Sequence, residues 1–284
     1  MGITGLSLSS VLQNNLPSSD TEKKKRVELA IATITCDGFG DMNFEPAFAM
    51  IPNLPFKNVE FNCWYARNLT PTGIRSIRER CRQHDLHPIC IQGSSFGAGG
   101  NIIKDVTHKL WNLDAARQLG CKRVKFTGAE RGKEGGLQAV IEVLKEIAPA
   151  AEEMDILILV ENHANNNLEN IEDYDRVFNA VPSQNVGMCM DNAHFDGANV
   201  DLMEVVHRFH SRIFHIDLKE TERKGIHKVV RFGEGVTDNT SVIEKMIDHG
   251  YSGYLLVEMA PPLDPQTLKA DLTKAYDLFH KYEK

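Results

Sequence analysis

Short apolar runs alternate with longer amphipathic stretches along the chain from Arg26 onward. Eight of these runs have the length of buried strands and are apolar on both faces, which is typical of parallel strands covered by helices. A count of eight favours closure into a single (β/α)8 TIM barrel over an open doubly wound sheet. The predicted strands are 27–34, 58–64, 87–93, 123–128, 155–161, 186–191, 212–218 and 254–258.

Segments with helical periodicity lie between these runs, and Gly120 and Gly250 mark the C-terminal ends of two of them. A doubly wound sheet usually carries a glycine-rich phosphate turn after its first strand, and CDGFGD at 36–41 does not match that turn. No linker-like composition divides the chain, so we expect one domain over 26–284, preceded by a polar lead-in at 1–25. The clearest predicted helices are 72–85, 106–120, 137–154, 201–210, 239–250 and 268–283.

The composition and net charge of the chain indicate which kinds of binding partner to expect. The chain has 284 residues, of which 42% are hydrophobic, as is usual for a globular protein with a sizeable core. A formal charge of −7 argues against nucleic acid or an anionic membrane as the main partner. Six scattered cysteines predict reduced, buried thiols in a cytoplasmic protein. No apolar stretch approaches the ~18 residues of a transmembrane span.

Several predicted strands finish in residues able to bind a metal or move a proton. The carboxyl ends of barrel strands form the active face, so we expect these side chains to converge on the barrel axis. They are Glu161 and His163 on the fifth strand, Asp191 and His194 on the sixth, His215, Asp217 and Lys219 on the seventh, and Glu258 on the eighth.

Carboxylates gathered at one point repel each other, and burying them is costly unless a cation or protons neutralise them. We therefore predict one divalent metal ion per chain. Oxygen ligands with few imidazoles suit Mn²⁺, Mg²⁺ or Co²⁺, and Zn²⁺ stays open although clustered cysteines are absent. The predicted ligands are Glu161, Asp191, Asp217 and Glu258.

The motifs at these strand ends resemble those of the xylose isomerase-like TIM-barrel superfamily, which includes sugar phosphate isomerases/epimerases and ketose 3-epimerases. The resemblance covers about the C-terminal 60% of the chain, in family order and spacing. It is carried by LGCKRVKFTG (119–128), LVENHANN (159–166), VGMCMDNAHFDGANVD (186–201), RIFHIDLKE (212–220) and GEGVTDNTSVIEKMIDHGYSGYLLVE (233–258).

The resemblance implies a role for individual residues. Glu161 and Glu258 match the family's two ligating glutamates, which in the epimerases also act as the acid–base pair on either face of the sugar. Asp191 matches the ligand on the sixth strand. His194 matches a residue that touches substrate, and Arg223 falls where the epimerases place a substrate-binding arginine.

The seventh strand departs from the epimerase pattern. Epimerases have HxH there, whereas this chain has His215-Ile216-Asp217. Xylose isomerase has an aspartate at the same place, so Asp217 is expected to remain a ligand. The acids that hold that enzyme's second metal are replaced here by His227 and Val229. The resemblance therefore implies one metal, and proton transfer instead of a hydride shift.

The predicted function is a metal-dependent isomerase or epimerase of a small sugar, sugar phosphate or related polyol acid. Lys219 and Arg223 could bind hydroxyl, carboxylate or phosphate groups, with His163, His194 and His215 as further substrate contacts. A lyase resembling inosose or dehydroshikimate dehydratases is the alternative on the same site. A DNA-repair activity is not favoured, because a His-rich three-zinc cluster and a basic face are missing from the sequence. A homodimer or homotetramer stays open.

Overall fold

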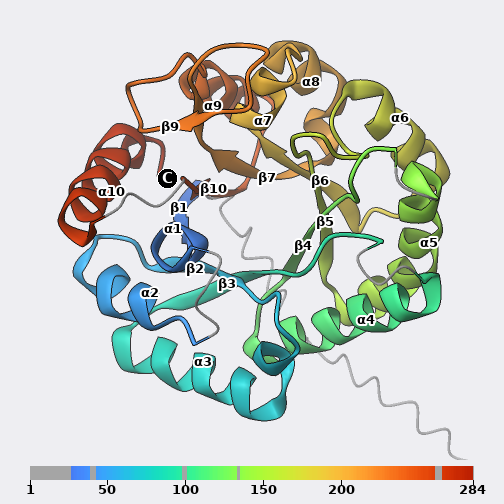
Figure 1. The fold of residues 1–284 in the computed structure, drawn as a ribbon, viewed down its shortest axis with the longest axis horizontal. Helices are drawn as coiled ribbons and strands as arrows, with labels where there is room; N and C mark the ends of the chain where they lie inside the picture. The colour runs from blue at the N-terminus through green and yellow to red at the C-terminus, as the bar shows by residue number, and fades with distance from the viewer. Residues whose placement is uncertain (1–26, 39–42, 98–100, 133–134, 260–263, 284) are drawn as a thin grey trace, which may run out of the picture.

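The computed structural model describes residues 27–38, 43–97, 101–132, 135–259 and 264–283, and the lead-in at 1–25 lies outside them. The predicted barrel is confirmed: eight parallel strands close in the order β1-β10-β7-β6-β5-β4-β3-β2 (Figure 1). The strands are β1 (Val27–Ala32), β2 (Asn58–Asn62), β3 (His87–Gln92), β4 (Arg123–Thr127), β5 (Leu157–Glu161), β6 (Val186–Asp191), β7 (Ile213–Leu218) and β10 (Gly253–Val257).

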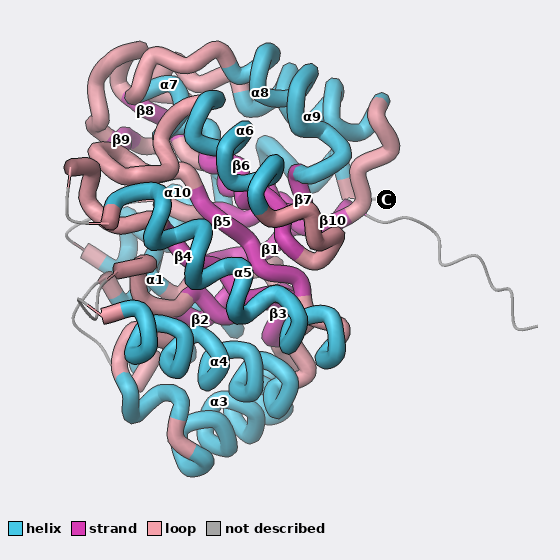
Figure 2. Tube along the Cα trace, turned by 90° about the vertical axis from the view of Figure 1, so that its right-hand side faces the viewer, coloured by secondary structure: helices cyan, strands magenta, loops and turns pink. Residues whose placement is uncertain are grey.

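Helices form a ring outside the strands, as both views show (Figures 1 and 2). All six predicted helices are present with small changes at their ends, and Gly120 ends α4 in the left-handed conformation at φ 81°. The α-helices are α1 (Ile34–Asp37), α2 (Glu45–Met50), α3 (Pro71–His84), α4 (Ile102–Leu119), α5 (Gly136–Met154), α6 (Ile171–Ala180), α7 (Asn192–Gly197), α8 (Leu202–Phe209), α9 (Asn239–Asp248) and α10 (Pro265–Phe279).

Helix α6 is not among the helices predicted most clearly from the sequence, although the residues at its N-terminus form a recognisable cap. Asn170 accepts a hydrogen bond from the backbone of Asp173, and the Asp173 side chain accepts one from the backbone of Asn170, which makes a capping box. Short 3₁₀ helices occupy Ile51–Asn53, Ala66–Leu69, His210–Arg212 and His280–Tyr282.

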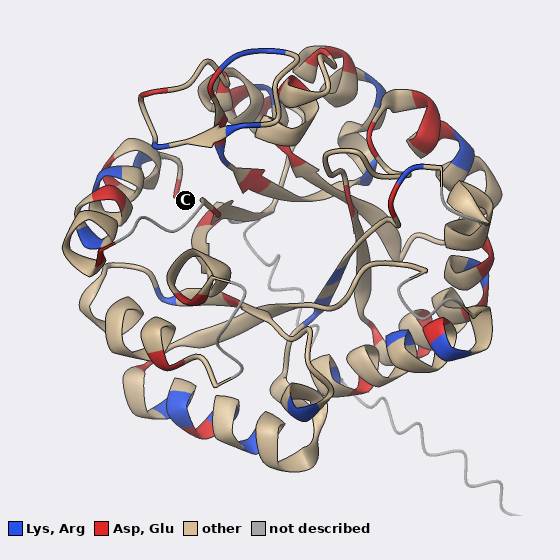
Figure 3. Ribbon diagram, viewed as in Figure 1, with Lys and Arg blue, Asp and Glu red and all other residues tan. Residues whose placement is uncertain are grey.

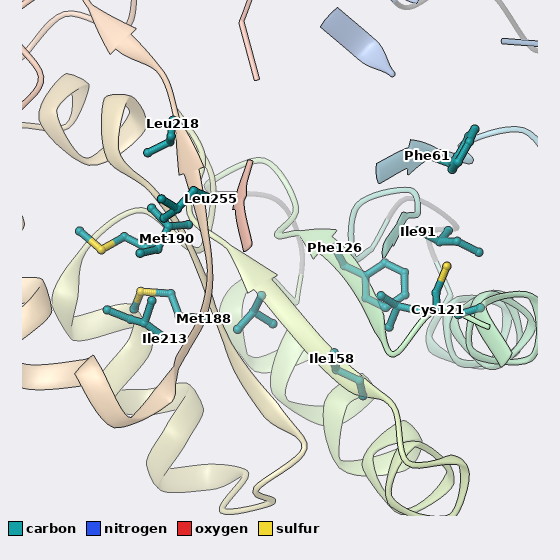
Figure 4. Packing of buried hydrophobic residues seen from close by; sticks show 14 of the residues in the cluster. Phe61, Ile91, Cys121, Phe126, Ile158, Met188, Met190, Ile213, Leu218 and Leu255 are labelled. Carbon is teal, nitrogen blue, oxygen red and sulfur yellow. The ribbon is translucent and has the colours of Figure 1, made fainter. Parts of the chain in front are cut away.

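The main core lies between the strands and the helices. Outward-facing strand residues such as Phe61, Phe126 and Met190 are buried there, and Figure 4 shows several of them in close packing. Burial of this kind is the main favourable term in folding, at about 25 cal/mol for each Å² of apolar surface. The barrel is thereby held closed from outside, which frees its interior for polar residues.

The barrel interior contains a second, smaller cluster of buried residues. Four of its members are small: Ala30, Ala32, Cys90 and Cys189. Small side chains leave room along the axis for longer ones from neighbouring strands. All six cysteines are free, and five of them are buried, as predicted.

A two-stranded antiparallel sheet, β8 (Glu220–Thr221) with β9 (Val229–Val230), follows β7. The Glu220 carboxylate accepts hydrogen bonds from the backbone of Gly233 and Gly235, which ties the segment after β9 to the end of β7. Among the described residues, no helix combines the length and the apolar character needed to cross a bilayer.

Candidate active site

The strand register brings the predicted polar residues to one end of the barrel. Thr127 of β4 is aligned with Glu161 of β5, and Asp191 of β6 is aligned with Asp217 of β7. Figure 3 shows that charged residues lie on the inner strands as well as on the outer helices. Since parallel strands point the same way, their carboxyl ends meet around one opening.

A cavity of about 410 Å³ opens at this end of the barrel. Glu161, Lys219 and Glu258 line it from the strand ends, and we call these three residues the cavity floor. They are only 1%, 5% and 6% exposed, so each presents little more than its polar tip. The rest of the lining is Ile34, Trp64, Gln92, Gly93, Ser94, Ser95, Thr127, His163, His194, Val229 and Met259.

Lys125 of β4 lies beneath the floor and is completely buried. Its Nζ is 2.7 Å from Glu60 Oε1 and 2.7 Å from Asp217 Oδ2. It is 3.2 Å from Glu258 Oε2 and 4.0 Å from Glu161 Oε2. Burial acts to lower the pKa of Lys125, but the four carboxylates outweigh it and raise that pKa well above its usual value. Lys125 is therefore a fixed positive charge inside the barrel.

Lys219 is the second buried ammonium, and it joins two carboxylates at the edge of the cavity. Its Nζ lies 2.6 Å from Asp191 Oδ2 and 2.7 Å from Glu258 Oε1. Burial acts to lower the pKa of Lys219, and these carboxylates reverse the effect and raise it well above its usual value. Glu258 thus lies between two ammonium groups, one in the cavity floor and one below it.

The environments of the two glutamates in the floor push their pKa values apart. Burial raises the pKa of Glu161 to about 8, and Lys125 offsets this only in part. Burial acts in the same direction on Glu258, but Lys125 and Lys219 outweigh it and lower the pKa of that carboxyl below its usual value. A pair of carboxyl groups with separated pKa values is a common acid–base arrangement in enzymes.

The rings of His163 and His194 lie side by side at the cavity wall, with centroids 4.2 Å apart and planes tilted by 41°. Burial lowers the pKa of His194 to about 3, despite the nearby Asp191, and it also lowers the pKa of His163. Both rings are therefore neutral near pH 7 and can donate or accept a hydrogen bond. Asp191 caps helix α7 by accepting a hydrogen bond from the backbone N–H of His194, which holds the backbone of that residue at the strand end.

The other two predicted substrate contacts lie away from the cavity. His215 is fully buried beneath the floor, with Nε2 3.5 Å from Asp217 Oδ1. Arg223 is exposed in the segment between β8 and β9 and is not among the lining residues.

The donor set of the site is of the kind that binds a divalent cation. Carboxylate oxygens of Glu161, Asp217 and Glu258 lie within 4.8 Å of one another, and Asp217 forms a second such group with Cys189 and His215. The chemistry of the first three carboxylates suits a divalent ion, but the space among them does not. The Lys125 ammonium already lies there.

Three polar residues near the predicted site were not predicted from the sequence: Glu60, Gln92 and Lys125. Gln92 donates a hydrogen bond from Nε2 to Glu161 Oε2 at 3.0 Å. Glu60 and Lys125 each interrupt an apolar strand, in NVEFN and RVKFT. A charged residue in the middle of a strand that is buried on both faces was the available signal, because in a barrel such a residue points toward the axis.

Comparisons with known proteins agree with the barrel fold. A family model described as xylose isomerase-like TIM barrel matches residues 48–276. An inosose dehydratase of Clostridium perfringens is 23% identical over 149 residues, which cover 47% of this chain and about half (50%) of that relative's length.

Two solved structures share the fold at low identity. The IOLI protein, whose structure holds a bound zinc atom, superposes with a TM-score of 0.75 at 18% identity, covering 90% of this chain and 99% of the other. A D-tagatose 3-epimerase-like protein superposes with a TM-score of 0.73 at 18% identity, covering 90% and 96%. With its closed barrel and a family match over most of its length, this chain belongs to the xylose isomerase-like TIM barrel family.

Proposed function

We propose that this protein is an isomerase or epimerase that moves a proton next to the carbonyl group of a small sugar, sugar phosphate or related polyol acid. One observation carries the proposal: Glu161, a carboxyl group with a pKa of about 8, and the Lys219 ammonium face the same 410 Å³ cavity. A base with a pKa near the working pH and a fixed positive charge are the two groups that enediolate chemistry requires.

In the proposed reaction Glu161 removes the hydrogen on the carbon next to the carbonyl. The electrons of that C–H bond form the C=C bond of an enediolate, and the π electrons of the carbonyl move onto its oxygen. Lys219 donates a hydrogen bond to this oxygen and stabilises its charge. In an isomerisation the neighbouring hydroxyl proton passes to the same oxygen, and Glu161 returns its proton to the carbon that carried the carbonyl.

The asymmetry between the two glutamates favours isomerisation by one acid–base group. Epimerisation with two groups also needs a protonated carboxyl on the opposite face, and the ammonium neighbours of Glu258 oppose its protonation. Glu258 instead holds Lys219 in place, with Asp191 on the other side. This assigns proton transfer to Glu161 and positioning to Glu258.

The cavity lining supports a polyhydroxylated substrate. Ser94, Ser95 and Thr127 offer hydroxyl groups, and His163 and His194 are the proposed ring contacts. Trp64 adds an aromatic surface that can pack against the C–H face of a sugar. Arg223 is exposed and could reach only a group that extends from the cavity, such as a phosphate.

A lyase is the second candidate, and the names of relatives favour it: the Clostridium perfringens protein is an inosose dehydratase. The first step would be the same proton removal by Glu161. The electrons of the enediolate would then form a new C=C bond to the next carbon as its C–O bond breaks. The departing hydroxyl would take the proton held by Glu161 and leave as water.

The experiment that tests the proposal is turnover of a panel of ketoses, aldoses, their phosphates and inososes in D₂O. Deuterium at the carbon next to the carbonyl, seen by proton NMR in recovered substrate or product, supports proton transfer. Loss of one water from the product, seen by mass spectrometry, identifies the lyase. Turnover in which the transferred hydrogen never exchanges would count against both. Elemental analysis tests the divalent ion predicted from the sequence, Mn²⁺, Mg²⁺ or Co²⁺ with Zn²⁺ open, separately from turnover.

A further inference from the structure

The Lys125 ammonium lies where the predicted ligands would have to hold a metal ion. It is 2.7 Å from Asp217, 3.2 Å from Glu258 and 4.0 Å from Glu161, the three carboxylates that cluster within 4.8 Å. Mg²⁺ and Zn²⁺ bind carboxylate oxygens at about 2.0–2.2 Å. An ion bound by these three groups would therefore press against the ammonium, and two positive charges at such a distance repel strongly in a buried site.

Lys125 has no solvent into which it could withdraw. Its side chain is completely buried, and Glu60 holds the same Nζ at 2.7 Å from another strand. The small residues Ala30 and Ala32 in the barrel interior are consistent with an axis that accommodates a long side chain. The position of the ammonium is thus built into the barrel.

Lys219 occupies the two predicted metal ligands that face the cavity edge, Asp191 and Glu258. It bridges Asp191 and Glu258 at 2.6 and 2.7 Å, and unlike Lys125 it lines the cavity. Every carboxylate predicted to bind metal consequently has a lysine Nζ within 4.0 Å. The positive charge that faces the substrate is then an ammonium group.

We propose that this site works without a divalent metal ion: Lys219 takes the ion's place at the cavity floor, and Lys125 fills the space among the carboxylates beneath it. The inference rests on the proposed function for the role of Lys219 as the electrophile. Its central claim, that two lysines replace the metal, concerns binding and is tested without any turnover.

The test is elemental analysis of the full chain, purified without chelator and then incubated with Mn²⁺, Co²⁺ or Zn²⁺ and desalted. The wild-type protein is expected to retain well below one ion per chain. Lys125→Ala and Lys219→Ala together with Asp217→His remove both ammonium groups and give the HxH motif, so this triple variant is expected to retain one ion per chain. Calorimetric titration with Mn²⁺ gives the same comparison in solution.

Lys109→Ala is the matched control, because Lys109 is equally buried but lies outside the carboxylate cluster. It pairs with Asp105 at 3.1 Å and donates to the backbone of Ser94 and Ser95 at the cavity wall. This variant should gain no ion. One tightly held ion per wild-type chain would overturn the proposal, whether or not the triple variant folds. A folded triple variant, checked by circular dichroism, that binds no more metal than the Lys109 variant would also overturn it. A metal-free wild type that turns over no substrate leaves this inference standing and removes the proposed function.

Discussion

Gln92 directs a hydrogen-bond donor at Glu161, with Nε2 3.0 Å from Oε2. The orientation of the Gln92 amide is set by its neighbours. Asn62 accepts hydrogen bonds from the Thr33 hydroxyl and the Ile34 backbone, so its own amide nitrogen is left to donate to Gln92 Oε1. Gln92 can then present only its N–H groups to Glu161, which favours the ionised form of that carboxyl.

Replacement of Gln92 should therefore weaken Glu161 as a base. In Gln92→Leu the pKa of Glu161 should rise further, and kcat/KM near neutral pH should fall about 10-fold. The pH–rate profile should move to higher pH, a change that loss of packing alone would not cause. Gln118→Leu, an exposed substitution on α4, is the control. An unshifted profile would show that Gln92 does not act on Glu161.

The pH dependence of the wild-type reaction follows from the raised pKa of Glu161. As a base, Glu161 has to be ionised, so kcat/KM should rise with pH and level off above about 8. His163 and His194, whose pKa values are lowered, stay neutral through this range and should add no second step. Initial rates measured from neutral to alkaline pH test this. A rate that falls as pH rises through that range would show that Glu161 acts as an acid and not as a base.

Glu161→Gln should abolish most of the activity and keep the fold. The amide fills the same space and still meets Gln92, but it cannot carry a proton. The expected loss in kcat is about 10²–10⁴-fold, the usual contribution of a general base. Steady-state kinetics with circular dichroism as a folding check decide it, and Glu153→Gln on the exposed face of α5 is the control. Near-normal turnover would exclude Glu161 as the acid–base residue.

Lys219→Met tests whether the Lys219 ammonium stabilises the enediolate oxygen. Loss of a donor to the developing oxyanion should lower kcat by about 10²–10³-fold, with a smaller effect on KM. Lys219→Arg keeps the charge and should recover part of the rate. Lys145→Met, exposed on α5, is the control. If the methionine variant changes KM alone, Lys219 binds substrate without stabilising the enediolate.

The barrel was predictable from sequence because its strands are buried on both faces, which leaves uninterrupted apolar runs such as those of β5 and β6. The carboxylates at the strand ends were predictable for the same reason, since each follows its run directly. Helix α6 was overlooked because the polar segment before it masks the capping signal at Asn170.

The pairing inside the barrel could not be read from local sequence. RVKFT shows that Lys125 interrupts an apolar strand, but the strand itself does not reveal which charges lie across the axis. Those partners come from β2, β7 and the end of β10, and only the register of the closed barrel brings Glu60 and Asp217 to the same nitrogen atom. The expected metal site and the observed lysine are thus two solutions to one problem, the repulsion among converging carboxylates.

The contacts of Lys125 also bear on how the chain folds. Its partners Asp217 and Glu258 are 92 and 133 residues away in sequence, so these ion pairs can form only when the last strands dock and the ring closes. Contacts made after the rate-limiting step slow unfolding and leave the folding rate almost unchanged. Lys125→Met should therefore lower the free energy of unfolding by about 3–5 kcal/mol, chiefly through faster unfolding in a denaturant-jump experiment. The Lys125 ammonium holds the end of the last strand, β10, from the barrel interior. Slow unfolding of the native state is the expected consequence.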